Sequence, residues 1–171
     1  MFIDGGYFNK VLENDFNRPR IDYYKFSELL CDPNYERLRT YYYNCMPFQD
    51  YSTDEENSRY LAMEKFIHSL KRLPRFEIRL GKLERINGAF VQKRVDILLA
   101  VDLVRLSWGE QIKTAIIITG DSDFVPAVEA AKDAGVLVQL YYSKSSIHDE
   151  LLSAVDESFE ITIGLIEQSK I

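Results

Sequence analysis

The chain has 171 residues, 46% of them hydrophobic and 28% charged, a composition typical of an ordinary globular protein. This length fits one domain, residues 1–171, that can bury its own core. The sequence has no run near the ~20 apolar residues of a membrane span, no signal-peptide pattern and too few cysteines for a disulfide framework. We therefore expect a cytoplasmic protein with no membrane partner.

The formal net charge of −6 argues by itself against a nucleic-acid partner, because phosphate binding is usually driven by Lys and Arg. The charge is unevenly distributed, however. Residues 71–94 contain eight basic and two acidic side chains and carry +6, so the rest of the chain carries −12. Such segregation suits an enzyme with one phosphate-facing side, although solvated faces of helices and hairpins produce similar runs.

The first part of the chain alternates between strand and helix patterns. Met1-Phe2-Ile3 is a short apolar strand that ends at Asp4, and the two glycines that follow allow a tight turn into a helix. Periodicity and chain breakers then predict helices near 8–14 and 24–30, a strand over 37–45, and a long amphipathic helix over 54–73.

The middle of the chain departs from this alternation. Residues 76–86 and 89–92 flank Asn87-Gly88, a dipeptide that supplies the positive φ angles of a type I′ turn. A β-hairpin insertion is therefore predicted over 76–92, and it carries much of the basic charge. The next segment, 95–106, is too apolar for a surface helix, so we expect a helix buried on most of its circumference, with Asp96 in its first turn.

The last part returns to alternating elements. Residues 114–119 form a continuous apolar strand of the kind found in the middle of a parallel sheet. A helix over 124–134, a strand over 136–142, a helix over 148–155 and a short strand over 160–163 follow. The whole pattern predicts an α/β fold, a three-layer α/β/α sandwich with a mainly parallel central sheet.

Two of the predicted strands end in carboxylates. Asp4 follows the first strand, and Asp121 and Asp123 follow strand 114–119. In open parallel sheets the active crevice lies outside the carboxyl ends of the strands. Carboxylates gathered there repel one another, and a divalent cation would neutralise them. Because these ligands are all oxygens and the two histidines form no recognisable pair, we predict Mg²⁺ or Mn²⁺ rather than zinc.

Each acidic residue also has a structural explanation. Asp121 or Asp123 could cap the helix that follows, since Asp is a favoured N-cap. One cap needs one residue, whereas the Gly-Asp-Ser-Asp sequence places two carboxylates and a hydroxyl at one strand end, which favours a site. Asp96 could be a charge at a helix N-terminus but is included as a candidate ligand. Asp102 fits a polar-face residue or a salt-bridge partner and is left out.

Four segments, FIDGG, KRVDILLAVD, TGDSDF and DELLSAVDESFE, resemble NYN domains of the LabA-like group, and the likeness covers essentially the whole chain. The resemblance implies the PIN-like nuclease fold, in which acidic residues at the strand ends hold Mg²⁺ or Mn²⁺ for cleaving RNA. By this resemblance the metal-binding and catalytic carboxylates are Asp4, Asp96, Asp121 and Asp123, supported by Ser122 and Thr119, with Lys93 near the scissile phosphate.

The expected substrate contacts include one departure from the family pattern. Many members place Asn three residues after the first Asp, whereas this chain has Tyr7 there and its next asparagine is Asn9. Both are candidate contacts at this corner. Tyr7 and Tyr42 could stack on bases of a single strand, although tyrosines in strands more often pack in the core. The basic residues expected to hold the RNA backbone are Lys93, Arg94, Arg79, Lys82 and Arg85.

We therefore predict a metal-dependent phosphodiesterase, a ribonuclease that hydrolyses single-stranded RNA with a metal-activated water. The alternative from another class is a nuclease-like module of little or no activity that binds RNA or a protein partner. A haloacid-dehalogenase-like phosphatase fits less well, because it needs Asp-x-Asp after the first strand and Asp4 is followed by two glycines. Self-association is compatible with the sequence.

Overall fold

A computed structural model describes the backbone of residues 1–47, 54–86 and 89–171, and the side chains of these residues outside 83–93. Within these residues seven strands form one sheet in the order β4-β3-β2-β1-β5-β6-β7. The strands are β1 (Phe2–Asp4), β2 (Thr40–Cys45), β3 (Phe76–Ile86), β4 (Ala89–Lys93), β5 (Thr114–Ile118), β6 (Leu137–Tyr142) and β7 (Glu157–Glu160).

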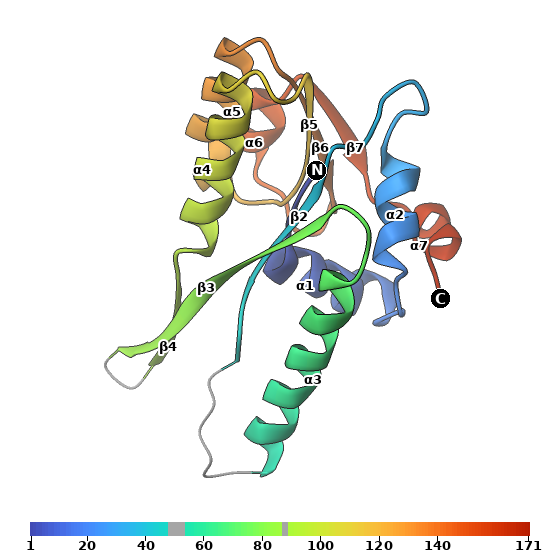
Figure 1. Ribbon diagram of the computed structural model, residues 1–171, viewed down its shortest axis with the longest axis vertical. Helices are drawn as coiled ribbons and strands as arrows, with labels where there is room; N and C mark the ends of the chain where they lie inside the picture. The colour runs from blue at the N-terminus through green and yellow to red at the C-terminus, as the bar shows by residue number, and fades with distance from the viewer. Residues whose placement is uncertain (48–53, 87–88) are drawn as a thin grey trace.

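The strand directions confirm the predicted mainly parallel sheet. Every neighbouring pair is parallel except β3 and β4, which pair antiparallel as the predicted hairpin. The hairpin's Asn87-Gly88 turn lies outside the described residues. The first half of β3 belongs to the parallel sheet, and its second half extends beyond β2 to pair with β4. The hairpin therefore projects from the sheet at its lower left (Figure 1).

Helices cover both faces of the sheet, which makes the fold the predicted three-layer α/β/α sandwich. α4 (Val95–Trp108), α5 (Val125–Asp133) and α6 (Asp149–Ala154) lie on one face (Figure 1). The opposite face carries α1 (Gly5–Phe16), α2 (Tyr23–Leu30), α3 (Asp54–Lys71) and α7 (Ile163–Gln168). A short 3-10 helix, η1 (Ser122–Phe124), precedes α5. No helix of the described ranges is long and apolar enough to cross a membrane.

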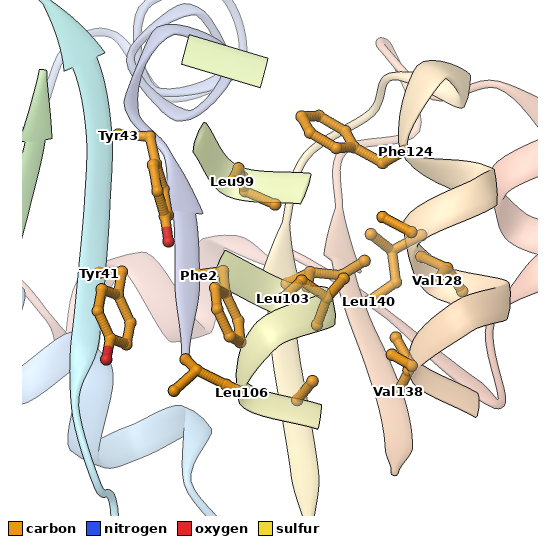
Figure 2. Close-up of a cluster of buried hydrophobic side chains, with 14 of the residues drawn as sticks. Phe2, Tyr41, Tyr43, Leu99, Leu103, Leu106, Phe124, Val128, Val138 and Leu140 are labelled. Carbon is orange, nitrogen blue, oxygen red and sulfur yellow. The ribbon is translucent and has the colours of Figure 1, made fainter. Parts of the chain in front are cut away.

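Each face of the sheet has its own apolar core. On the first face, Leu99, Leu103 and Leu106 of α4 point toward the strands, in the same cluster as Phe2 and Leu140 (Figure 2). The second core lies under the helices of the other face and includes Ile3, Phe8, Phe26 and Tyr42. Because both faces are covered, the central strand β5 is apolar and buried from its second residue to its last.

The strand order reverses direction between β1 and β5. From β1 the chain moves outward through β2 and β3, and after α4 it starts again at β5 and moves outward the other way through β6 and β7. At such a reversal the connecting segments leave the sheet toward opposite faces, so a crevice opens beyond the carboxyl ends of the two central strands. The carboxyl ends of β1 and β5 are where the acidic residues were predicted.

The prediction that α4 is buried on most of its circumference is wrong. Leu103, on the side that faces the sheet, is fully buried. Ile97, Val101 and Trp108, on the opposite side, are 65%, 55% and 62% exposed. Apolar composition alone cannot distinguish a helix enclosed on all sides from one that is apolar on two faces and packed on one.

The end of the chain also differs from prediction. The last strand is Glu157–Glu160 rather than 160–163, and residues Ile163–Gln168 form a helix that was not predicted. The β-branched residues after Glu160 resemble a strand, but the Thr162 hydroxyl caps the helix by accepting a hydrogen bond from Leu165 N at 3.3 Å. Ile166 on this helix is fully buried in the second core, so tertiary packing decides its conformation.

The one-sided burial of α4 predicts unequal costs for equivalent truncations. Leu103→Ala should lower the free energy of unfolding by about 2–5 kcal/mol, because it leaves a cavity in a closed core. Ile97→Ala, on the exposed side, should change it by about 0.5 kcal/mol or less. Urea denaturation of both variants measures the difference. Similar large losses for both would show that the outer side of α4 is buried in solution.

Candidate active site at the carboxyl ends of β1 and β5

Asp4 ends β1 and begins α1. Its Oδ1 accepts a hydrogen bond from Tyr7 N at 3.0 Å, so the carboxylate is the N-cap of the helix. Its Oδ2 accepts a weak hydrogen bond from the Thr119 hydroxyl at 3.4 Å. The helix can start directly after Asp4 because Gly5 has no side chain: a Cβ there would lie 2.3 Å from Cζ of Tyr42. The close approach holds Asp4 at the strand end.

Asp121 and Asp123 lie just beyond the end of β5. The backbone N of Asp121 donates to the Thr119 hydroxyl at 3.4 Å, the same hydroxyl that donates to Asp4. Oδ1 of Asp121 accepts from Asp123 N at 3.0 Å, which caps η1. Asp121 is half-buried and Asp123 is exposed. Thr119, fully buried, thus links the carboxylate of β1 to the turn after β5.

Asp96 reaches the same place from a third element. It lies in the first turn of α4, a helix that packs against β1 and η1. Arg94, the residue before the helix, has a φ of 75°, a left-handed conformation, and makes no side-chain cap. The Asp96 side chain is exposed. Both interpretations of Asp96 from the sequence, a metal ligand and a charge at the helix N-terminus, fit this position.

Neighbouring charges within this cluster raise the pKa values of Asp4 and Asp96. Burial raises the pKa of Asp4, and the charge of Asp96 raises it further, against hydrogen bonds to the carboxylate that lower it. Partial removal from water also raises the pKa of Asp96, although its side chain is largely exposed, and the charges of Asp121 and Asp123 raise it further. Repulsion of this kind is tolerated in proteins when a cation neutralises the group or when a proton does. Asp96 is therefore the electrostatic centre of the cluster.

The donor chemistry of this cluster fits a hard divalent cation, since all its ligand atoms are oxygens. The side-chain positions fit less closely. Among the described residues no three His, Cys, Asp or Glu side chains converge closely enough to hold a metal ion. Asp4 and Asp121 each use Oδ1 as a cap, and Oδ2 of Asp4 also accepts the weak hydrogen bond from Thr119. A cation at this site would be held by the Oδ2 atoms of both residues together with Asp96 or Asp123.

Comparison with known proteins identifies the family. The model of the NYN domain matches residues 1–162. The chain belongs to the NYN domain family. This family has the PIN-like nuclease fold, its members are nuclease-like in general, and PIN-like nucleases usually use divalent metals.

The NYN domain also resembles a solved structure. The crystal structure of a protein of unknown function from Vibrio parahaemolyticus superposes with a TM-score of 0.72 at 18% sequence identity. The match covers 99% of this chain and 93% of the other, and it supports the fold alone. A search of curated protein sequences finds no match.

The basic window of residues 71–94 is not gathered on one side of the NYN domain. Residues 71–75 connect α3 to the start of β3, at the opposite edge of the sheet from Asp4. Lys82 is exposed and lies three residues beyond Arg79, which is level with Asp4 through Tyr43 in the strand register. Arg94 is exposed beside Asp96. The side chains of Arg85 and Lys93 lie outside the described residues.

Arg79 is engaged within the fold. Its Nε donates to Oδ2 of Asp102 at 3.1 Å, and its guanidinium lies 5.4 Å from the centre of the Tyr41 ring. Asp102 is buried and also accepts from the Tyr43 hydroxyl and from Arg105, each at 3.0 Å. The salt-bridge alternative considered for Asp102 is therefore the observed one. A substrate phosphate would have to compete with a buried carboxylate for Arg79, so this residue serves the fold.

The other predicted RNA contacts, Tyr7, Tyr42 and Asn9 near Asp4, also have their functional groups in the interior. Tyr42 is fully buried and Tyr7 is 9% exposed, so neither ring is open to a base. The structure follows the core-packing alternative for both. Asn9 is exposed, but its amide nitrogen donates to the Tyr42 hydroxyl at 3.4 Å and its oxygen accepts from the Tyr23 hydroxyl at 3.5 Å. Its polar atoms therefore point into the domain.

The sequence interpretation missed the loop after β6. Residues 143–148 lie beside the turn at Gly120, and His148 N donates to Gly120 O at 3.3 Å. Ser143 and Ser145 donate from their hydroxyls to the carboxylate of Asp15 on α1, at 2.5 and 2.9 Å. The serine-rich sequence directly after a buried strand could have indicated this loop, because the carboxyl ends of all parallel strands lie on the same side of the sheet.

Neutralising Asp4 should stabilise the metal-free protein at neutral pH. The raised pKa means that the folded protein holds this proton to higher pH than the unfolded chain does. The free energy of unfolding therefore falls as pH rises from about 4 through the raised pKa, and the loss is complete above it. Asp4→Asn removes the charge, and Asn remains a good N-cap.

Thermal denaturation in EDTA between pH 3.5 and pH 8 measures this effect. The Tm advantage of Asp4→Asn over the parent chain should be present at pH 7 and shrink toward pH 3.5. Asp133→Asn, an exposed change at the end of α5, is the control and should show no pH-dependent advantage. An Asp4→Asn protein less stable than the parent chain at pH 7 would contradict the electrostatic account.

Proposed function

We propose that this NYN domain is a divalent-metal-dependent phosphodiesterase that hydrolyses single-stranded RNA. The observation that carries the proposal is the meeting of Asp4 and Asp121 at the reversal of strand order. One buried hydroxyl, that of Thr119, contacts both the Asp4 carboxylate and the Asp121 backbone. Asp96 on α4 adds a third charge that raises the pKa of Asp4. A bound cation would neutralise the repulsion among these carboxylates.

Asp4, Asp96, Asp121 and Asp123 would hold Mg²⁺ or Mn²⁺ in this proposal. When bound, such a cation lowers the pKa of a coordinated water and neutralises charge on the leaving oxygen. The residues of the chain supply the rest. The caps at Asp4 and Asp121 fix one oxygen of each carboxylate, so the other has a defined direction. Asp96, exposed at the start of α4, lies where it can accept a proton from a water molecule.

The substrate would approach along the hairpin side of the site. Lys82 and Arg94 are exposed and pair with no described residue, so both are available to phosphates. Arg85 and Lys93 belong to the same hairpin in sequence and extend this basic group in the proposal. Arg79, Tyr7 and Tyr42 are no longer part of it, because each is held in the fold. Asn9 is left out for the same reason, since its amide group contacts Tyr42 and Tyr23.

Within the NYN family we infer membership of the LabA-like group, on the sequences FIDGG and TGDSDF at the two strand ends. We further propose that residues 1–171 act as one domain, and that the enzyme works in the cytoplasm, where single-stranded RNA is available.

A second candidate function has a specific observation in its favour. Two of the four carboxylates already serve as helix caps, and no three acidic side chains of the described residues converge on one point. An NYN domain with this arrangement could bind RNA, or a protein partner, without cleaving it. The two candidates separate in one assay, because a binding module retains RNA without producing fragments under any metal.

Asp121→Asn tests the catalytic proposal. Cleavage of a single-stranded RNA in Mn²⁺ should fall by about 100-fold or more, because a carboxylate that holds the cation is lost. The amide of Asn can still cap η1, so the fold should be retained. Gel analysis of RNA fragments with Mn²⁺, Mg²⁺ or EDTA measures the effect, and Asp133→Asn serves as the control. Cleavage that persists in EDTA or in Asp121→Asn would refute the metal mechanism.

Lys82→Ala tests the path of the substrate. RNA affinity should weaken for every sequence, and the slope of log affinity against log salt should become shallower by about 0.7, as expected for one lost contact to single-stranded phosphates. Fluorescence anisotropy over a salt series in Ca²⁺ or EDTA gives this slope. Lys10→Ala, at an exposed position of α1, is the matched control. An unchanged slope in Lys82→Ala would remove the hairpin from the binding surface.

A further inference from the structure

Tyr7 contacts the ends of three neighbouring strands. Its backbone N donates to Asp4 at the end of β1. Its phenol oxygen accepts a hydrogen bond at 2.9 Å from the backbone N of Ser143, the first residue after β6. Its ring lies against Gly120, after β5, where an added Cβ would be 2.5 Å from Cε2 of Tyr7. The side chain therefore passes across the end of β5 and joins the strands on either side of it.

Gly120 is the complement of Tyr7. A side chain at this position would meet the tyrosine ring on one side and the carbonyl oxygen of Ser146, at 2.2 Å, on the other. The loop that contains Ser146 also holds Gly120 from His148, through the hydrogen bond at 3.3 Å. The turn that carries Asp121 is thus enclosed between the ring of Tyr7 and the loop after β6. The loop forms one side of this enclosure, and it contacts the Tyr7 side chain on the other side through Ser143.

The loop after β6 is attached to α1 at two points. Ser143 N donates to the Tyr7 hydroxyl, and the hydroxyls of Ser143 and Ser145 donate to Asp15, two turns further along the same helix. Only the first attachment is buried. A backbone N–H in such a place needs an acceptor, and a side chain shorter than tyrosine at this position could not extend over Gly120 to supply it.

We propose that Tyr7 is a positioning residue for the candidate active site, and that its hydroxyl fixes the Gly120–Asp121 turn relative to Asp4. Tyr7 touches no substrate in this role. It acts through the loop after β6, which forms one wall of the turn. An effect of Tyr7 on catalysis rests on the proposed function. Its effect on the position of the turn is a property of the fold and can be measured without metal or RNA.

Tyr7→Phe removes only the hydroxyl and keeps the ring against Gly120. Tyr43→Phe is the matched control: Tyr43 is also buried, pairs with Asp4 in the strand register, and uses its hydroxyl for Asp102 instead. Amide hydrogen exchange of the metal-free proteins is measured for peptides covering 119–124 and 143–148. Tyr7→Phe should speed exchange in both segments about 10-fold, and Tyr43→Phe should leave both unchanged.

The second readout is Mn²⁺ affinity, from titration of the metal alone into each full chain. Tyr7→Phe should weaken Mn²⁺ binding about fivefold or more, and Tyr43→Phe should not, even if both variants lose similar thermal stability. Unchanged exchange in 119–124 for Tyr7→Phe, or equal increases in both variants, would overturn the proposal. Absence of Mn²⁺ binding by the parent chain would contradict the proposed function, and the exchange result would still decide the role of Tyr7.

Discussion

The parallel pairing of β1 with β5 is the constraint on which the rest of this NYN domain depends. Residues 3 and 118 are paired in this ladder although more than a hundred residues separate them in sequence. The pairing places the residues that follow each strand side by side, and it is also the point where the strand order reverses. A carboxylate at the end of β1 and a carboxylate after β5 must then share one crevice, whatever the surrounding helices do.

Bringing the acidic residues together lowers the stability of the folded protein, because their charges repel one another. Asp4 is partly withdrawn from water and repelled by Asp96, so its charged form is disfavoured. The fold limits this cost by giving each strand-end carboxylate a second role as a cap, with N–H donors that favour the charge. Capping and metal binding are therefore compatible uses of Asp4 and Asp121. Oδ1 of each carboxylate caps the helix, and Oδ2, which in Asp4 also accepts the weak hydrogen bond from Thr119, can bind a ligand.

The sequence predicted the features that depend on local pattern and on strand direction. Asp4 and Asp121 were recognisable because each directly follows an apolar strand, and parallel strands end at one edge. The structural role of Tyr7 was not predictable, because its partners, Gly120 and Ser143, are distant in sequence and meet it only through the strand order. The basic window of residues 71–94 was misleading for a related reason. β3 runs parallel to β2, so the start of the window lies at the amino ends of the strands and the rest lies at or beyond their carboxyl ends.

Helix α4 shows a second limit of sequence reasoning. Its apolar residues correctly indicated a helix packed on the sheet, but Val101 and Trp108 are exposed on the other side. Composition reports how much of a helix is apolar and does not report how many neighbours it has. The helix at the end of the chain was missed for a different reason. The burial of Ile166 outweighs the strand propensity of the β-branched residues before it.

A divalent cation bound between the carboxyl ends of β1 and β5 would be located by anomalous diffraction from crystals of the full chain grown with Mn²⁺. We expect a manganese peak within coordination distance of Asp4 and Asp121, and the loss of that peak in Asp121→Asn crystals. Well-ordered carboxylates with no peak between them, or a peak at another place in the molecule, would show that these carboxylates do not form the metal site.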